Sequence, residues 1–147
     1  MVVPFASELS FVYRIIKQTV ETYGLRCERS DEIFVSKPVV EDLKDKIAEA
    51  DLVIVDFTGR NPNVYYEAGL ADAWKKNWII LAQSSDDMTF DVRHIRSIRY
   101  SNMMGADLQL REHLEQSLEA LGYREQRPDQ ETVNDEENAG KRKRRSR

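Results

Sequence analysis

The stretch that decides the fold is residues 51–73, DLVIVDFTGRNPNVYYEAGLADA. It begins with a continuous apolar run that is closed by Asp56, a pattern typical of a strand covered on both faces, as in a parallel sheet. Asn61 followed by Pro62 predicts a helix start, because asparagine is favoured as N-cap and proline at the first helical position. The stretch therefore predicts a strand, a loop and a helix, with Glu67 between one and two turns into that helix.

The rest of the chain alternates between strand and helix patterns. WIILAQ, at residues 78–83, is a second apolar strand, and weaker strand candidates are a short run at 1–3, LRCER at 25–29 and IRSIRYS at 95–101. Strands that alternate with helical patterns predict an α/β fold. We expect a doubly wound, mostly parallel five-stranded sheet with helices on both faces, a Rossmann-like or flavodoxin-like three-layer sandwich.

Composition divides the chain near Gly122. From residue 128 onward, aliphatic side chains almost disappear, and a run of acids precedes the basic cluster KRKRR at 141–145. Such a segment buries too little apolar area to offset the entropy lost on ordering. We therefore expect one α/β domain over residues 1–122 and a disordered charged tail over residues 123–147.

Charge and cysteine content limit the partners and the compartment. The net charge of −4 argues against nucleic-acid binding by the folded body, so nucleic acid is expected only at the basic tail, if at all. Cys27 is the only cysteine, which favours a reducing, cytoplasmic location. No apolar run approaches the roughly 20 residues of a membrane-spanning helix, so no membrane partner is expected.

The sequence lacks the common cofactor and metal motifs. It has neither a P-loop nor a G-x-G-x-x-G motif, and its cysteine and histidines do not have metal-ligand spacing. We expect no cofactor and no metal. His94 and His113 fit structural or solvent-exposed roles better than catalytic ones. The remaining groups are carboxylates, amides and hydroxyls, which suit glycosidic chemistry, where two acids act on an oxocarbenium-like transition state.

Two carboxylates are the catalytic candidates. Ligands of parallel α/β sheets bind outside the carboxyl ends of the strands, and Asp56 closes its strand at that edge. Glu67 borders a predicted apolar helix face that includes Tyr66, Leu70 and Trp74. A carboxylate against aromatic groups in a half-dry cleft can have a raised pKa or act as a nucleophile. The alternative is a surface glutamate that contacts a residue one turn away.

Three segments also resemble a known family: VVPFASE at 2–8, ADLVIVDFTGRNPNVYYEAGLADAWKKNWIILAQ at 50–83 and FDVRHIRSIRYSN at 90–102. They resemble small Rossmann-like proteins related to nucleoside 2-deoxyribosyltransferases and, more distantly, to the NAD-cleaving TIR domains. The resemblance covers roughly residues 1–121, and DFTGRNPNVYYEAGLA is its most specific part.

The resemblance implies roles for individual residues. Glu67 matches the glutamate that attacks the anomeric carbon in the transferases and binds ribose in TIR-type enzymes. Asp56 matches an acid that assists protonation or orientation of the base. The remaining substrate-binding residues that we expect are Pro4, Phe5, Glu8, Thr58, Gly59, Asn61, Asn63 and Tyr66.

The expected function is cleavage of the N-glycosidic bond of a nucleoside or nucleotide, or transfer of its deoxyribosyl group, with Glu67 as nucleophile. Asn61 stands where the transferases carry an aspartate that contacts the sugar, which leaves hydrolase readings open. Two alternatives remain: a TIR-like effector that cleaves NAD, and a non-catalytic nucleotide-binding module. The expected partner is a nucleoside, a nucleotide or NAD, and the resemblance also favours a homo-oligomer.

Overall fold

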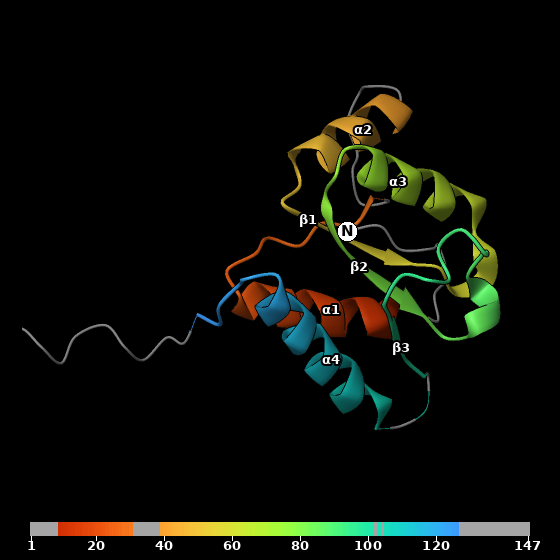
Figure 1. Ribbon diagram of the computed structural model, residues 1–147. Coiled ribbons are helices and arrows are strands. Elements are labelled where there is room, and N and C mark those ends of the chain that lie inside the picture. The colour runs from red at the N-terminus through yellow and green to blue at the C-terminus, as the bar shows by residue number, and fades with distance from the viewer. Residues whose placement is uncertain (1–8, 31–38, 102, 104, 127–147) are drawn as a thin grey trace, which may run out of the picture.

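A parallel sheet forms the centre of the molecule (Figure 1). The computed structural model describes residues 9–30, 39–101, 103 and 105–126. In that part of the chain the sheet has three strands in sequential order, which are β1 (Leu52–Asp56), β2 (Asn77–Ala82) and β3 (Ser97–Arg99). Because all three strands run in the same direction, their carboxyl ends lie at one edge of the sheet.

Helices cover both faces of this sheet, as Figure 1 shows. They are α1 (Ser10–Thr22), α2 (Val39–Glu49), α3 (Pro62–Ala73) and α4 (Ala106–Ala120). Helices α1 and α4 pack together on one face, and α2 and α3 pack together on the other. Two short 3-10 helices, η3 (Thr58–Arg60) and η4 (Ser85–Asp87), follow β1 and β2 at the carboxyl edge. The predicted α/β class with helices on both faces is confirmed.

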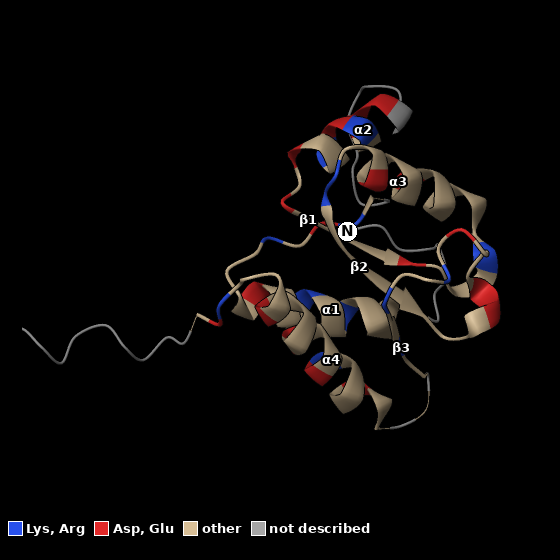
Figure 2. Cartoon of the chain, viewed as in Figure 1, with Lys and Arg blue, Asp and Glu red and all other residues tan. Residues whose placement is uncertain are grey.

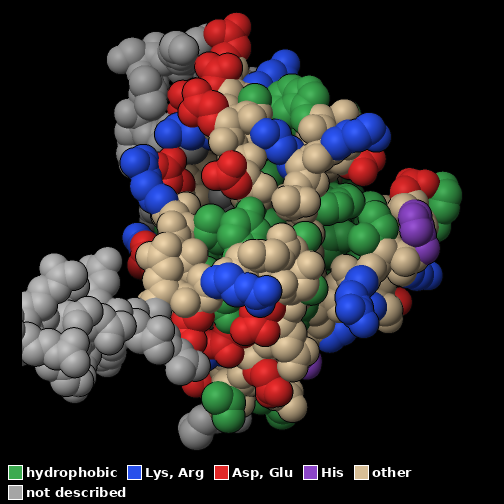
Figure 3. All heavy atoms as spheres, turned by 60° about the vertical axis from the view of Figure 1, so that its left-hand side comes forward, with side chains coloured by type: hydrophobic (Ala, Val, Ile, Leu, Met, Phe, Trp, Pro, Cys, Tyr) green, Lys and Arg blue, Asp and Glu red, His purple; other side chains and the backbone are tan. Residues whose placement is uncertain are grey.

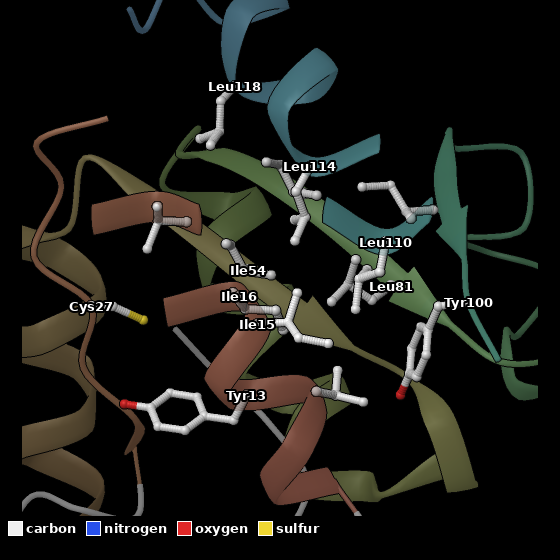
Figure 4. Packing of buried hydrophobic residues seen from close by; sticks show 14 of the residues in the cluster. Tyr13, Ile15, Ile16, Cys27, Ile54, Leu81, Tyr100, Leu110, Leu114 and Leu118 are labelled. Atoms are coloured by element: carbon white, nitrogen blue, oxygen red, sulfur yellow. The ribbon is translucent and has the colours of Figure 1, made fainter. Parts of the chain in front are cut away.

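Successive residues of β1 enter two separate apolar clusters. Ile54 packs with residues of α1 and α4, whereas Val53 and Val55 pack with residues of α2 and α3. Figure 4 shows Ile54 and Leu81 of the sheet together with the α1 and α4 side chains that pack around them. Since neither face of the strand meets water, the sequence of β1 is apolar throughout rather than alternating.

Four parts of the sequence prediction differ from the structure or lie outside it. Residues 25–29 form no strand; their charged side chains pair locally instead, and Glu28 accepts a 3.0 Å hydrogen bond from the Lys46 Nζ. The predicted strand at residues 1–3 lies outside the described residues, as does the tail from residue 127. Contacts continue past the predicted boundary at Gly122, because the Gln126 N–H donates to the Thr22 carbonyl at 2.8 Å.

No helix in the described ranges has the length and apolar character needed to cross a membrane. Charged residues lie mainly on the helices and loops, and the strands are almost free of them (Figure 2). The exception within β1 is its last residue, Asp56. The three described strands therefore place a single acid, Asp56, at the carboxyl edge of the sheet.

Candidate functional site at the carboxyl edge

Asp56 is deeply buried where β1 ends. Its side chain is 1% exposed, and both carboxylate oxygens have donors. The Thr58 backbone N–H donates to Oδ1 at 2.9 Å, and the Tyr100 hydroxyl donates to Oδ2 at 2.5 Å. Because a buried carboxylate is costly unless its oxygens accept hydrogen bonds, these two donors explain how the fold tolerates an acid here.

Tyr100 connects Asp56 to the loops after β1 and β2. Its Oη lies 3.1 Å from Thr58 Oγ1, and Thr58 Oγ1 accepts the Gln83 backbone N–H at 3.1 Å. The four residues thus form one continuous hydrogen-bond network at the carboxyl edge. Sequence reasoning missed Tyr100, although its position one residue after β3 at the same edge was a usable signal.

Burial changes the acid–base properties of both groups. Burial raises the pKa of Asp56, hydrogen bonds from Thr58 and Tyr100 partly oppose this, and the nearby charge of Asp87 adds to the rise. Burial also raises the pKa of the Tyr100 phenol, and the negative charge of Asp56 acts in the same direction. Ionisation is thus disfavoured at both ends of the Asp56–Tyr100 hydrogen bond.

Glu67 is also buried, at 6% exposure. It lies on the face of α3 formed with Val64, Ala68 and Ala71, the face that packs toward the sheet. The alternative of an ordinary surface glutamate is therefore wrong, because this side chain is shielded from solvent.

The prediction that Tyr66 and Trp74 belong to the buried apolar face of α3 is wrong. Tyr66 and Trp74 are 46% and 40% exposed, so the large aromatic residues face outward and small residues with Glu67 face the sheet. Small side chains let α3 approach the strands closely, which leaves Glu67 as the long polar group on that face. Tyr66 was predicted to bind substrate, and the structure places it on the outer side of the helix.

Asn61 is the N-cap of α3, as predicted. Its side-chain oxygen accepts the Asn63 backbone N–H at 3.0 Å, and Pro62 occupies the first helical position. Asn63 is exposed in the first turn. The Asn61 side chain, which was also expected to bind substrate, therefore serves the helix end.

The η3 and η4 loops are joined through Asp87. Its carboxylate accepts the Gly59 N–H at 3.2 Å and the Ser84 N–H at 2.9 Å, and its backbone carbonyl accepts the Tyr65 hydroxyl. Gly59 has φ of 77°, a left-handed conformation that glycine adopts without strain. Its N–H, predicted to meet substrate, is directed to Asp87 instead.

Four of the predicted site residues, Asp56, Thr58, Gly59 and Asn61, lie between the end of β1 and the start of α3 at this edge, and Glu67 lies further along α3 on the face toward the sheet. The three others from the first loop, Pro4, Phe5 and Glu8, lie outside the described residues. Within the described ranges, no three His, Cys, Asp or Glu side chains form a group that could hold a metal.

Two cavities lie away from this edge. One, of about 350 Å³, is lined by residues that include Cys27, Lys46 and Leu52; the other, of about 630 Å³, lies between β3 and α4 near His113. Neither is lined by Asp56 or Glu67. Figure 3 shows hydrophobic atoms lying open between charged side chains on one side of the molecule. We place the candidate site at the buried acids rather than at either cavity, because buried carboxyl groups are more common at functional sites than elsewhere.

Comparison with known proteins adds no family assignment. No protein-family model matches the chain, and no curated protein matches it. The functional interpretation therefore depends on the geometry of the carboxyl edge and on the motif resemblance.

Proposed function

We propose that the protein cleaves or transfers the N-glycosidic bond of a nucleoside or nucleotide, with Glu67 as nucleophile. One observation carries this proposal: in the described part of the chain, Asp56 and Glu67 are the only buried carboxyl groups, and they come from β1 and α3, which are separated only by the short helix η3. Burial raises the pKa of Asp56, and buried acids with perturbed ionisation gather at functional sites more often than elsewhere.

The proposed reaction has two steps. A carboxylate oxygen of Glu67 attacks the anomeric carbon, the C–N bond breaks, and the base leaves with the bonding electron pair and takes up a proton. Water or a second base then attacks the same carbon, which releases Glu67 as a carboxylate. The attack of water gives hydrolysis, and the attack of a base gives transfer.

In the proposed reaction, Asp56 acts on the ligand indirectly. Its carboxylate is almost fully buried and both oxygens already accept hydrogen bonds, so it acts on a ligand through Thr58 and Tyr100. This differs from the direct contact with the base that the resemblance implies.

We also propose that the complete sheet has five strands. A five-stranded, doubly wound sheet requires two strands in addition to β1, β2 and β3. The burial of β1 and β2 between two apolar clusters, one on each face, supports this larger sheet, because doubly wound sheets are covered by helices on both faces.

A second candidate is a nucleotide-binding module without catalysis. The Asn61 side chain is engaged as a helix cap, and the Asp56 oxygens are both engaged within the protein. Two of the polar groups expected to act on substrate therefore have structural partners, which favours binding without turnover.

One experiment distinguishes the enzyme from the binding module. The protein is incubated with a panel of nucleosides, deoxynucleoside monophosphates and NAD, and the free base is measured by chromatography. Glu67→Gln should lower base release at least about 10³-fold, because the nucleophile is lost. Asp72→Asn is the matched control, since Asp72 is an exposed acid of the same helix, and it should keep full activity. Undiminished release by Glu67→Gln would refute the nucleophile; tight binding in calorimetry without product would establish the binding module.

A further inference from the structure

The hydrogen bonds around Asp56 have a fixed direction when Asp56 is ionised. A tyrosine hydroxyl carries one proton, and Tyr100 donates its proton to Asp56 Oδ2. The Thr58 hydroxyl proton then points into the network, toward Tyr100 Oη at 3.1 Å or the Asp56 carboxylate, whose pKa a side-chain hydrogen bond from Thr58 lowers. Thr58 Oγ1 also accepts from the Gln83 N–H, which leaves one lone pair of that oxygen for an outside donor.

Protonation of Asp56 reverses this direction. A protonated Asp56 donates to Tyr100 Oη, so Tyr100 donates to Thr58 Oγ1. Both lone pairs of that oxygen are then filled, by Tyr100 and by the Gln83 N–H. The Thr58 proton is left to point out of the network. When Asp56 is protonated, the Thr58 hydroxyl can therefore donate a hydrogen bond to a ligand. When Asp56 is ionised, the Thr58 oxygen can accept one.

Exposure identifies the end of the network that a ligand can reach. Asp56 and Tyr100 are buried, whereas Thr58 is half-buried at the start of η3. Gln83, also half-buried, hydrogen-bonds to Tyr100 through its side chain. Figure 4 shows the Tyr100 side chain beside the buried cluster at the end of the sheet.

We propose that Asp56, Tyr100 and Thr58 form a proton relay whose outer end is the Thr58 hydroxyl, and that this hydroxyl protonates the leaving base. In the transfer, the Thr58 proton moves to a nitrogen of the base, the Tyr100 proton moves to Thr58 Oγ1, and the Asp56 proton moves to Tyr100 Oη. The electron pair of the broken C–N bond remains on the base, and Asp56 ends as a carboxylate. Within the relay, Thr58 is the catalytic residue, and Asp56 and Tyr100 are positioning residues that act through it.

The surroundings of Asp56 support storage of a proton there. Among the described residues, the titratable groups that affect the pKa of Asp56 are Tyr100 after β3 and Asp87 of η4, and α3, which packs against β1, carries the buried Glu67. All of these are neutral or negative, and its strand neighbour in the register is Leu81. Burial raises the pKa of Asp56, as a proton store requires.

The relay itself can be tested without any substrate. In protein labelled with ¹³C at tyrosine Cζ and aspartate Cγ, the Tyr100 and Asp56 signals should shift with pH at one common midpoint, above the ordinary aspartate value of 3.8. Asp56→Asn should abolish the Tyr100 shift. Tyr23→Phe is the matched control, since Tyr23 donates to Glu119 in another tyrosine–carboxylate pair and its loss should change neither signal. A Tyr100 signal that stays constant while Asp56 titrates would overturn the relay.

The role of Thr58 is tested on two leaving groups, and this arm rests on the proposed function. Thr58→Val should lower kcat/KM on 2′-deoxyadenosine roughly 10²-fold, as expected for a lost general acid, while Thr58→Ser keeps most of it. With 4-nitrophenyl 2-deoxyribofuranoside, whose leaving group needs no proton, Thr58→Val should equal the wild type. Equal losses on both substrates would refute proton delivery by Thr58. If the wild type releases no leaving group, the proposed function fails, while the NMR titration still decides the relay.

Discussion

The carboxylate of Asp87 accepts the backbone N–H of Gly59 at 3.2 Å and so fastens the loop after β1 to the loop after β2. The same carboxylate caps η4 through the Ser84 N–H. One side chain therefore holds two loops of the candidate site in a fixed relation.

Asp87→Ala should lower the free energy of unfolding by about 1–2 kcal/mol, because the cap and the link to Gly59 are both lost. Urea denaturation measures this change, and amide exchange at Gly59 should become faster. Asp86→Ala is the matched control, because Asp86 is exposed in the same short helix, and its effect should stay within about 0.5 kcal/mol. Equal stability of the two variants would show that the Asp87 link contributes nothing.

Asn61→Ala should lower the free energy of unfolding by about 1 kcal/mol, since the Asn63 N–H loses its side-chain acceptor. Asn61→Asp should retain wild-type stability or exceed it slightly, because a carboxylate also caps and interacts favourably with the helix dipole. Urea denaturation of both variants at neutral pH tests the pair. If Asn61→Asp is destabilised as much as Asn61→Ala, the cap does not explain the residue.

The pKa of Asp56 makes the stability dependent on pH in a defined direction. Because burial raises that pKa in the folded state, the folded protein binds this proton more tightly than the unfolded chain does. The contribution is present in full below the ordinary aspartate pKa of 3.8 and is lost as the pH rises through the folded pKa.

The difference in unfolding free energy between wild type and Asp56→Asn should therefore decline as the pH rises above about 4, with a slope of at most about 1.4 kcal/mol per pH unit. Urea denaturation of both proteins at a series of pH values from acid to neutral measures it. Taking the difference between the two proteins cancels the contributions of the other titrating groups to the unfolding free energy. A difference that grows with pH would mean that hydrogen bonding outweighs burial at this site.

Leu114 tests the packing of α4 on the sheet. It is 0% exposed, and Leu114→Ala should cost about 2–5 kcal/mol through lost burial and a residual cavity. Leu108, on the same helix, is 70% exposed, so Leu108→Ala should have a small effect. Thermal or urea unfolding of the two variants checks the contrast, and similar losses would contradict the assigned faces of α4.

Local sequence signals predicted β1 and the start of α3 well. The apolar run before Asp56 and the Asn61–Pro62 cap each depend on neighbouring residues, so they can be recognised without tertiary information. Tyr100 could not be predicted in the same way, because the residue it contacts, Asp56, lies 44 positions away in the sequence. Only the common edge of two strands brings the pair together.

The orientation of α3 was mispredicted for a different reason. Apolar periodicity assigns the largest hydrophobic residues to the buried face, and here it selected Tyr66 and Trp74. Helix α3 instead packs on the sheet through Ala68 and Ala71, with Glu67 on the same face. Close approach of a helix to a sheet requires small residues, a demand that hydrophobicity alone does not express.

After α4, the chain passes beside the C-terminal end of α1. Gly24 has φ of +73°, and a side chain there would come within 2.1 Å of the Gln126 amide; the Gln126 backbone also binds the Thr22 carbonyl. This crossing lies beside the start of β1, where Tyr123 reaches the Asp51 carbonyl at 3.5 Å. An immobilising tether or fluorescent tag joined after Gln126 would therefore begin at the edge opposite Asp56, so that a surface-bound sample would present its candidate site to the solution.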